Sequence, residues 1–321
     1  MVRFLIRRVL TGALVLLLVT MVVFVIFYVG PGPKAVAHVL AGKQASPSEI
    51  AAEAKRLHLN LPLWHQYWIF LVNILHGNLG YDYYHGESVV SIIGQAFPIT
   101  LSLALGAAVL WLTIGVLTGV VSAVRSRSVA DRVLTVAALV FYSMPTFVLG
   151  LLMLLVFYYV LTTHGLAFFP PGGYTPIGTS PWLWFKGLIL PWITLALVSA
   201  APYTRLTRGA LLDVLGEDYI RTARAKGLAE RRVTYRHGLR AALTPVASQF
   251  GIDVGVLLGG AVITETVFSM PGLGYTAVQA IQTQDLPVII GIVLIAATAV
   301  VVANLLVDIV YALLDPRVRL H

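Results

Sequence analysis

The sequence predicts an all-α, polytopic membrane protein with six transmembrane helices. Two observations support this fold class, its composition and the length of its apolar stretches. Of the 321 residues, 58% are hydrophobic and only 11% are charged, whereas about 25% are charged in an ordinary globular domain. The apolar residues gather in stretches that approach or exceed the roughly 20 residues needed to cross a bilayer. Cysteine is absent, which excludes a disulfide framework and a thiolate metal site.

The chain begins with an apolar run at residues 9–30, preceded by three arginines. A cleaved signal peptide is the alternative, because Ala35-Val36-Ala37 looks like a cleavage site. The apolar core of a signal peptide is about 7 to 15 residues long, which is shorter than this run. We therefore expect residues 1–30 to form a retained N-terminal transmembrane helix.

Residues 31–98 form the expected extracytoplasmic insert between the first two transmembrane helices. Residues 48–57 are predicted to form a short helix, with Ser48 as its N-cap. An aromatic face suited to the membrane interface follows, formed by Trp64, Tyr67, Trp68 and Phe70. No metal site is expected, because the histidines are seven, eleven and nine residues apart, not the three or four that bring two ligands together on one helix, and no cysteine assists them: they are His58, His65, His76 and His85.

Residues 99–321 form the expected transmembrane domain. Its predicted spans are residues 99–124, 133–161, 187–204, 245–268 and 288–314. Pro145 predicts a kink in the third span, because proline cannot donate the helical hydrogen bond. Small residues that permit close helix packing occur in the second and fifth spans, namely Gly115, Gly119, Gly251, Gly255 and Gly259. The segments 162–186 and 268–287 are expected to be outside loops or turns.

Residues 205–245 interrupt the apolar pattern with the densest charge cluster of the chain. This segment holds nine Lys/Arg and four Asp/Glu, which is 13 of the chain's 36 charged residues. The pattern predicts two short helices around Gly227, with small residues that allow close approach and arginines that can reach acceptors on a partner. A solvated basic loop beside anionic lipid headgroups is the alternative interpretation.

The distribution of basic residues predicts the orientation. With residues 205–245 inside, 17 Lys/Arg lie in inside segments and five lie in outside segments. Because positive residues concentrate on the cytoplasmic side, both termini are expected in the cytoplasm. The net charge of +8 then needs no nucleic-acid partner.

Motifs for enzymatic chemistry are missing from the sequence. The Gly42-Lys43 pair is not followed by Ser or Thr, so no phosphate-binding G-x-x-x-x-G-K-[ST] loop is present. No H-E-x-x-H or G-x-S-x-G pattern occurs either. We expect a chain without catalytic residues, and any ATPase to be a separate polypeptide.

Three acidic residues lie within or at the ends of predicted spans: Asp253, Glu265 and Asp308. Ionisable groups in a membrane are costly and usually face a cavity or a partner. Asp253 and Glu265, together with Phe268 at the end of the fifth span, are our candidates for a substrate path. Asp308 is a weaker candidate, because near the inside end it could simply pair with a neighbouring helix.

DYIRTARAKGLAERRV at residues 218–233, followed by RHGLRAALTPV, resembles the signature loop of ATP-binding-cassette (ABC) importer permeases of the dipeptide/oligopeptide/nickel family, B type. SMPTFVLG, PGLG and YALLDPRVR are similar to other stretches of that family. The wider superfamily favours Glu where this chain has Arg221, a change that the peptide branch tolerates.

The resemblance implies a type I importer transmembrane domain whose cytoplasmic loop docks in an ATPase subunit. The implied coupling residues are Arg221, Thr222, Ala223, Arg224, Ala225, Lys226, Gly227, Leu228 and Arg231. The implied partners are a second homologous permease, two ATP-binding subunits or one fused ATPase chain, and an extracytoplasmic substrate-binding protein. No cofactor is implied in this chain, and ATP and Mg²⁺ would bind the ATPases.

The expected function is peptide import across the cytoplasmic membrane. Nickel, haem or another small solute carried by the same architecture remains an alternative, because loop motifs report the coupling machinery and not the cargo. A secondary transporter or channel is an alternative of another class, but it would predict an array of intramembrane charges that three scattered acids support poorly.

Overall fold

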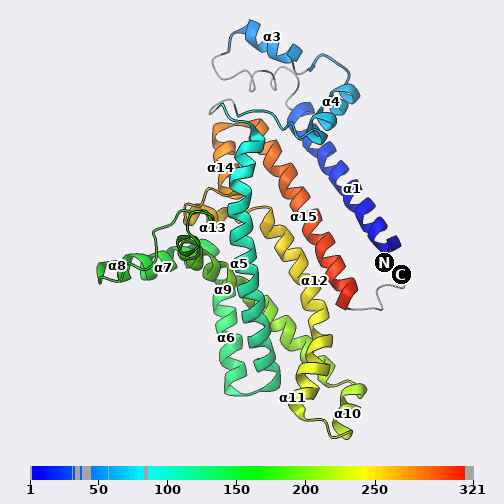
Figure 1. The fold of residues 1–321 in the computed structure, drawn as a ribbon, viewed down its shortest axis with the longest axis vertical. Helices are drawn as coiled ribbons and strands as arrows, with labels where there is room; N and C mark the ends of the chain where they lie inside the picture. Colours follow the sequence, from blue (N-terminus) through cyan, green and yellow to red (C-terminus); the bar gives the residue numbers. More distant parts are fainter. Residues whose placement is uncertain are drawn as a thin grey trace.

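The computed structural model describes residues 2–30, 32, 37, 45–56, 58–82 and 86–314. The helices and π-helical segments of these residues are α1 (Val2–Phe24), η1 (Val25–Val29), α3 (Pro47–Arg56), α4 (Leu63–Leu75), α5 (Val89–Val124), α6 (Val129–Ser143), α7 (Thr146–Met153), η2 (Leu154–Val160), α8 (Leu161–Thr163), α9 (Pro181–Leu215), α10 (Asp218–Ala225), α11 (Glu230–Arg232), η3 (Val233–Gly238), α12 (Leu239–Leu258), α13 (Val262–Val267), α14 (Leu273–Thr283) and α15 (Leu286–Leu314). Figure 1 shows α3, α4 and α14 at one end of the molecule and α10 and α11 at the other.

Six helical stretches among the described residues are long and apolar enough to cross a membrane, which confirms the predicted all-α, six-span class. They are Ile6–Val29, Val89–Val124, Thr146–Thr163, Pro181–Leu215, Glu230–Leu258 and Leu286–Val307. The fourth is longer than predicted, because α9 continues to Leu215 and so includes Leu211 and Leu212. The first part of the charge cluster, residues 205–215, therefore belongs to α9.

The third predicted span, residues 133–161, is broken at the proline. α6 ends at Ser143 and α7 starts at Thr146, so the membrane-length stretch is Thr146–Thr163 alone. Met144 is extended, with ψ of 128°, because the residue before proline disfavours helical geometry. In Figure 1, α6 lies along α5 while the segment from α7 to α8 runs out to the side of the bundle. The predicted kink is therefore a complete break.

The core is built on a close seam between α5 and α9. A Cβ added to Gly106 would lie 2.0 Å from the Trp192 ring, and one added to Gly115 would lie 2.4 Å from Tyr203 Cβ. A Cβ at Gly119 would lie 2.6 Å from Thr207 Cβ. The predicted close packing at Gly115 and Gly119 is therefore confirmed, with α9 as the helix that they contact.

A second seam joins α12 to α15. Gly251 lies against Val307 and Gly255 against Val300, as the small-residue stripe predicted. Gly259 instead ends α12, so the fifth span stops about ten residues before the predicted residue 268. The chain then forms the short α13, and the predicted turn at 268–287 contains the eleven-residue helix α14. The helix breaks at Gly259 and Gly260, where Gly260 has a left-handed φ of 121°, and helical structure resumes as α13 and then, after the PGLG turn begins, as α14.

The outer insert is fastened to α1 by aromatic rings. The ring centroid of Phe24 is 5.3 Å from that of Tyr28 and 5.7 Å from that of Phe70. Trp64 and Trp68 stay exposed, so only part of the predicted aromatic face is free for the membrane interface. The predicted helix at 48–57 corresponds to α3, but the predicted N-cap was wrong: Ser48 lies within the helix, and the hydroxyl of Ser46 accepts the Glu49 N–H.

The second span starts earlier than predicted. The Ser88 side chain accepts a hydrogen bond from Ser91 N–H, and Pro98 is accommodated within α5, so the helix begins at Val89 and not at residue 99. Some predictions lie outside the described residues: Ala35 and Val36 of the alternative cleavage site, His85, the side chain of Asp308 and most of the YALLDPRVR ending.

Candidate functional site

The charge cluster between α9 and α12 forms the predicted pair of short helices, α10 and α11. Gly227 lies between them with a left-handed φ of 75°. The N–H of Gly227 donates to the Arg224 carbonyl over 2.9 Å, and the N–H of Leu228 donates to the Ala223 carbonyl over 3.4 Å. This pair of bonds closes a helix C-terminus and favours glycine at the left-handed position. Gly227 therefore fixes where α10 ends.

Arg224 holds the two short helices together. Its Nη2 lies 2.7 Å and its Nε 3.0 Å from the Glu230 carboxylate oxygens, and its Nη1 lies 3.5 Å from the Leu215 carbonyl. The hydrogen bonds to Glu230 raise the pKa of the Arg224 guanidinium. The sequence reasoning treated Arg224 as free to reach a partner, but in this structure it is engaged within the chain.

The candidate coupling residues form an exposed surface on apolar supports. Ala223 and Leu228 are half-buried. The other members of the set are exposed: Arg221, Thr222, Arg224, Ala225, Lys226, Gly227 and Arg231. Ile220 and Val233 are fully buried beneath them. The surface is thus basic and accessible while its position is set by packing.

A buried ion pair ties the same end of the molecule to the α5–α6 turn. Arg208 Nε and Nη2 on α9 each donate to one Asp131 oxygen over 2.9 Å. The Ser122 hydroxyl and the Arg127 N–H also donate to Asp131. Arg208, followed by these two donors, holds the pKa of Asp131 well below its ordinary value. Asp131 is 5% exposed, so it fixes α6 against α9 just above the coupling surface.

Glu265 organises the PGLG turn between α13 and α14. One oxygen accepts the Thr100 hydroxyl over 2.7 Å and the other accepts the Tyr275 N–H over 2.9 Å. Thr100 Oγ1 in turn accepts the Leu273 N–H over 2.8 Å. A Cβ at Gly272 would lie 2.6 Å from the Glu265 carboxyl carbon. The acid caps the N-terminus of α14, where free N–H groups favour a negative charge.

The other substrate-path candidates lie in different surroundings. Glu265 is fully buried, and Phe268 is 1% exposed, with its carbonyl accepting the Gly173 N–H over 2.8 Å. Phe268 therefore anchors the 162–186 loop. Asp253 is only partly buried and bonds to Tyr203 and Gln249. The structure thus does not bring Asp253 and Glu265 into one polar cluster.

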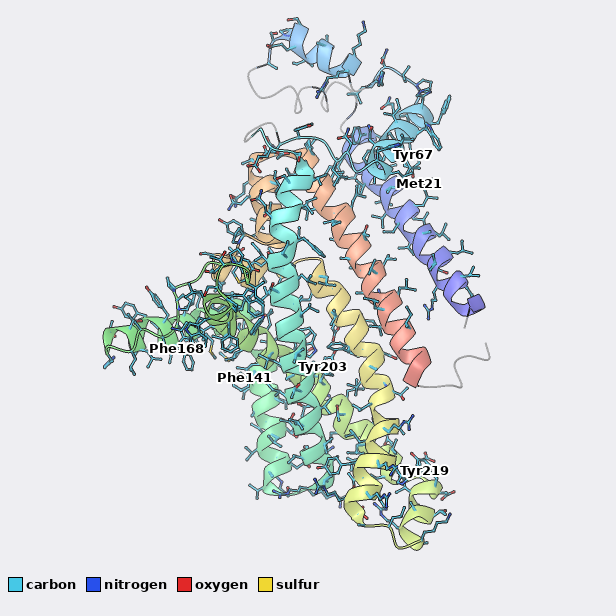
Figure 2. All side chains as sticks on the ribbon, viewed as in Figure 1. Met21, Tyr67, Phe141, Phe168, Tyr203 and Tyr219 are labelled. Atoms are coloured by element: carbon cyan, nitrogen blue, oxygen red, sulfur yellow. The ribbon has the colours of Figure 1, made fainter. Side chains whose placement is uncertain are left out.

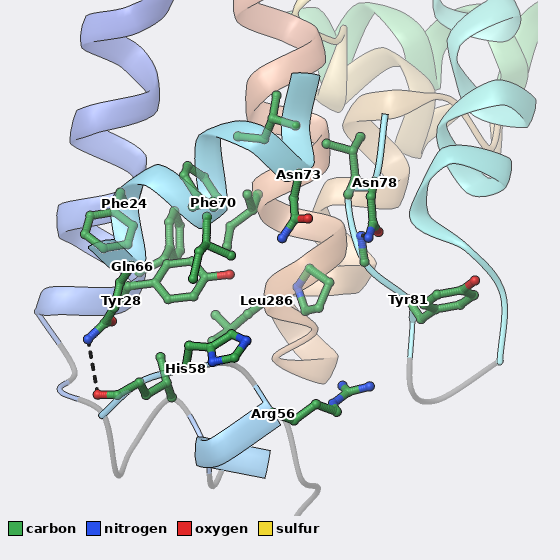
Figure 3. A pocket seen from close by; sticks show the side chains of 18 residues that line it. Phe24, Tyr28, Arg56, His58, Gln66, Phe70, Asn73, Asn78, Tyr81 and Leu286 are labelled. Carbon is green, nitrogen blue, oxygen red and sulfur yellow. Dashed lines mark hydrogen bonds between the residues drawn. The ribbon is translucent and has the colours of Figure 1, made fainter. Parts of the chain in front are cut away.

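A cavity of about 410 Å³ lies between the end of α1 with η1, helix α4 and the start of α15. Figure 3 shows aromatic rings on one side, with Phe24 and Phe70 among them, and the polar side chains of His58, Asn73 and Asn78 around the opening. The stretch 78–81 contributes to its wall. This stretch follows α4 and belongs to the insert between the first two spans.

Sequence reasoning missed the network around Asp131. A local signal existed, because Ser128-x-x-Asp131 is a helix-capping pattern, and Ser128 Oγ does accept the Asp131 N–H. No local sequence pattern marks Arg208 as the ion-pair partner of Asp131. Thr100 and Tyr203 were also missed, since a single hydroxyl on an apolar helix gives no indication of the acid that it meets.

A bundle of six membrane helices with a basic helix–turn–helix at one end defines the membrane-spanning subunit of a transporter. The chain belongs to the family described as binding-protein-dependent transport system inner membrane component, which matches residues 115–320. The N-terminal region of the same transport systems matches residues 1–104. These two matches confirm the family to which the signature loop pointed, and they cover nearly the whole chain.

Relatives with assigned names are similar over the full length. A probable peptide ABC transporter permease of Sinorhizobium fredii is 36% identical, covering 98% of this chain and 99% of its own. The dipeptide transport system permease DppB of Escherichia coli is 36% identical over 99% of both chains. Among solved structures, the methionine ABC transporter MetNI matches with a TM-score of 0.55 and 18% identity, covering 70% of this chain and 96% of the matched one. The structural similarity to MetNI supports the predicted fold of a type I importer transmembrane domain.

Proposed function

We propose that the chain is one of two permease subunits of an ATP-driven importer that moves peptides across the cytoplasmic membrane. The exposed surface of α10, Gly227 and α11 carries this proposal, because a membrane protein without a phosphate-binding loop needs such a surface to receive force from a separate ATPase. Full-length similarity to permeases named for peptides supports the cargo.

The arrangement assigns one partner to each end. An ATPase pair, holding ATP and Mg²⁺, would dock on the basic surface at the α10–α11 end. We expect this end and both termini in the cytoplasm, because positive residues concentrate on that side. A substrate-binding protein would dock at the outer end, where the insert and the cavity lie (Figure 1). A second, homologous permease would complete the path. Closure of the ATPases would then switch the path between outward and inward access.

The docking surface is tested by one substitution made at two matched glycines. Gly227 and Gly165 both have left-handed φ angles, 75° and 85°, and a Cβ at either meets nothing within 4 Å. Gly227→Asp should abolish co-purification of the ATPases and ATP-dependent peptide uptake in proteoliposomes, because it puts an unpaired carboxylate into the interface. Gly165→Asp, in the loop after α8, should retain both.

Each possible result bears on a different part of the proposal. Equal ATPase binding and uptake by the two variants would contradict docking at Gly227. Uptake of nickel or haem, but of no peptide, by the unaltered complex would contradict the peptide cargo while leaving the docking surface intact.

A further inference from the structure

Asp253 is an ionisable side chain inside the apolar helix α12. Its Oδ2 accepts the Tyr203 hydroxyl over 2.7 Å, and its Oδ1 accepts the Gln249 amide N–H over 2.9 Å. A charged group exposed to lipid at this position would be costly, so intramembrane acids normally face a path, a cavity or a partner. The question is which cation or donor completes the surroundings of Asp253.

The acid lies inside the helix bundle, opposite the last third of the membrane-length stretch of α15, Leu286–Val307. The α12 residues on either side of it, Gly251 and Gly255, pack against Val307 and Val300 of α15. Figure 2 shows Tyr203, the donor to Asp253, closer to the α10–α11 end of the molecule than to the other end. Asp253 therefore lies within the span on the side of α10 and α11, where water supplied along a path is the alternative to lipid.

The carboxylate has unused acceptor capacity. A carboxylate offers about four acceptor positions, and two hydrogen bonds to Asp253 are present. Among the described residues, no Lys, Arg or His side chain pairs with it. Its side chain is partly exposed, and the neighbouring Ile252 and Val256 are 54% and 68% exposed. The free acceptor positions thus lie at the edge of an uncovered face of α12.

The side that holds Asp253 is rigid. Tyr203 is 1% exposed, and its ring lies 6.3 Å from that of Trp111, which is 2% exposed. Gln249 holds the other oxygen from one turn below on the same helix. The donor groups are therefore fixed before any ligand arrives, which is the arrangement of a preformed binding position.

We propose that Asp253, oriented by Tyr203 and Gln249, binds the α-ammonium group of the peptide during its passage. The inference rests on the proposed function and names the group of the cargo that this position takes. A primary ammonium is compact and carries three N–H donors, and its bonds to a carboxylate are charge-assisted. The peptide's own carboxylate is repelled by the same charge, so the site selects the amino end.

The test uses the complete importer, with both permeases, the ATPases and the binding protein, in proteoliposomes containing ATP. Initial uptake of labelled dialanine is measured against concentration for the wild type, Asp253→Asn, Asp253→Glu and the control Ser248→Ala. Ser248 is an exposed polar residue of the same helix whose hydroxyl bonds within the helix. The purified complexes are also compared for subunit composition by size exclusion.

Asp253→Asn should lower the maximal uptake rate at least tenfold and the peptide-stimulated ATPase rate in parallel. The half-saturating concentration should not change, because the binding protein sets it. Asp253→Glu should stay within about threefold of wild type, because charge is retained, and Ser248→Ala should match wild type.

Two results would overturn the inference while leaving the proposed function standing. One is wild-type uptake by Asp253→Asn. The other is loss of the second permease from the Asp253→Asn complex, which would mean that Asp253 pairs with that subunit. Absence of dialanine uptake by the wild-type complex would instead count against the proposed peptide cargo.

Discussion

The seam between α5 and α9 makes a sharp prediction for Gly119→Ala. An added Cβ at Gly119 would lie 2.6 Å from Thr207 Cβ and 2.8 Å from the Thr204 carbonyl oxygen. Neither atom can move by a side-chain rotation, since one is a Cβ and the other is backbone. The two helices must therefore separate by several tenths of an ångström along the most closely packed part of the bundle.

The expected cost follows from the size of the clash. Forcing one extra carbon into a well-packed core destabilises a protein by about 1–3 kcal/mol. Both glycine-to-alanine changes in α5 gain the same helix propensity, so the clash sets the difference between them: with roughly 2 °C of midpoint change per kcal/mol for a larger chain, the unfolding midpoint of Gly119→Ala should lie about 2–6 °C below that of Gly94→Ala. The measurement is thermal unfolding of the purified permease in one detergent, followed by intrinsic tryptophan fluorescence.

Gly94→Ala is the matched control on the same helix. A Cβ at Gly94 meets nothing within 4 Å, and alanine is a better helix former than glycine by about 1 kcal/mol. Its midpoint should be unchanged or slightly higher. Equal midpoints for Gly119→Ala and Gly94→Ala would refute the reasoning, because they would show that α5 and α9 do not approach as closely as described.

Two further substitutions test the buried acids. Glu265→Gln leaves one oxygen for two donors, the Thr100 hydroxyl and the Tyr275 N–H; leaving one of them unpaired costs about 1–3 kcal/mol, so the midpoint should fall, while the exposed Glu87→Gln should leave it unchanged. Asp131→Asn should lower the midpoint by removing the ion pair with Arg208. Because the folded-state pKa of Asp131 is depressed, its contribution is complete above about pH 4, the unfolded value, and is lost as the pH falls further. A wild-type-to-variant difference that grows on acidification would contradict this assignment.

Features that depend on one short stretch of sequence were predictable. Pro145 breaks its helix because proline and the residue before it carry the constraint themselves. Gly227 separates two helices for the same kind of reason, since a left-handed position needs a residue without a Cβ. The structure adds how far each effect goes: the helix is completely broken at Pro145, and the end of α10 is closed by hydrogen bonds at Gly227.

Features that depend on two distant stretches were not predictable. Thr100 and Glu265 are 165 positions apart, and Asp131 and Arg208 are 77 apart. Nothing in either local sequence indicates its partner, because the pairing arises only when the helices pack. The turn at PGLG was expected to be irregular for a related reason: the acid that caps α14 lies on α13, before the turn.

The proposed cargo position and the coupling surface are both connected to one helix, α9. α9 meets Asp253 of α12 through Tyr203 and Asp131 of α6 through Arg208. Its last residue, Leu215, is twelve residues beyond Tyr203, a separation of about 18 Å along a helix. No loop intervenes between the two points, so a displacement of α10 acts directly on the helix whose tyrosine holds Asp253. Force from an ATPase and contact with the cargo would therefore meet within α9.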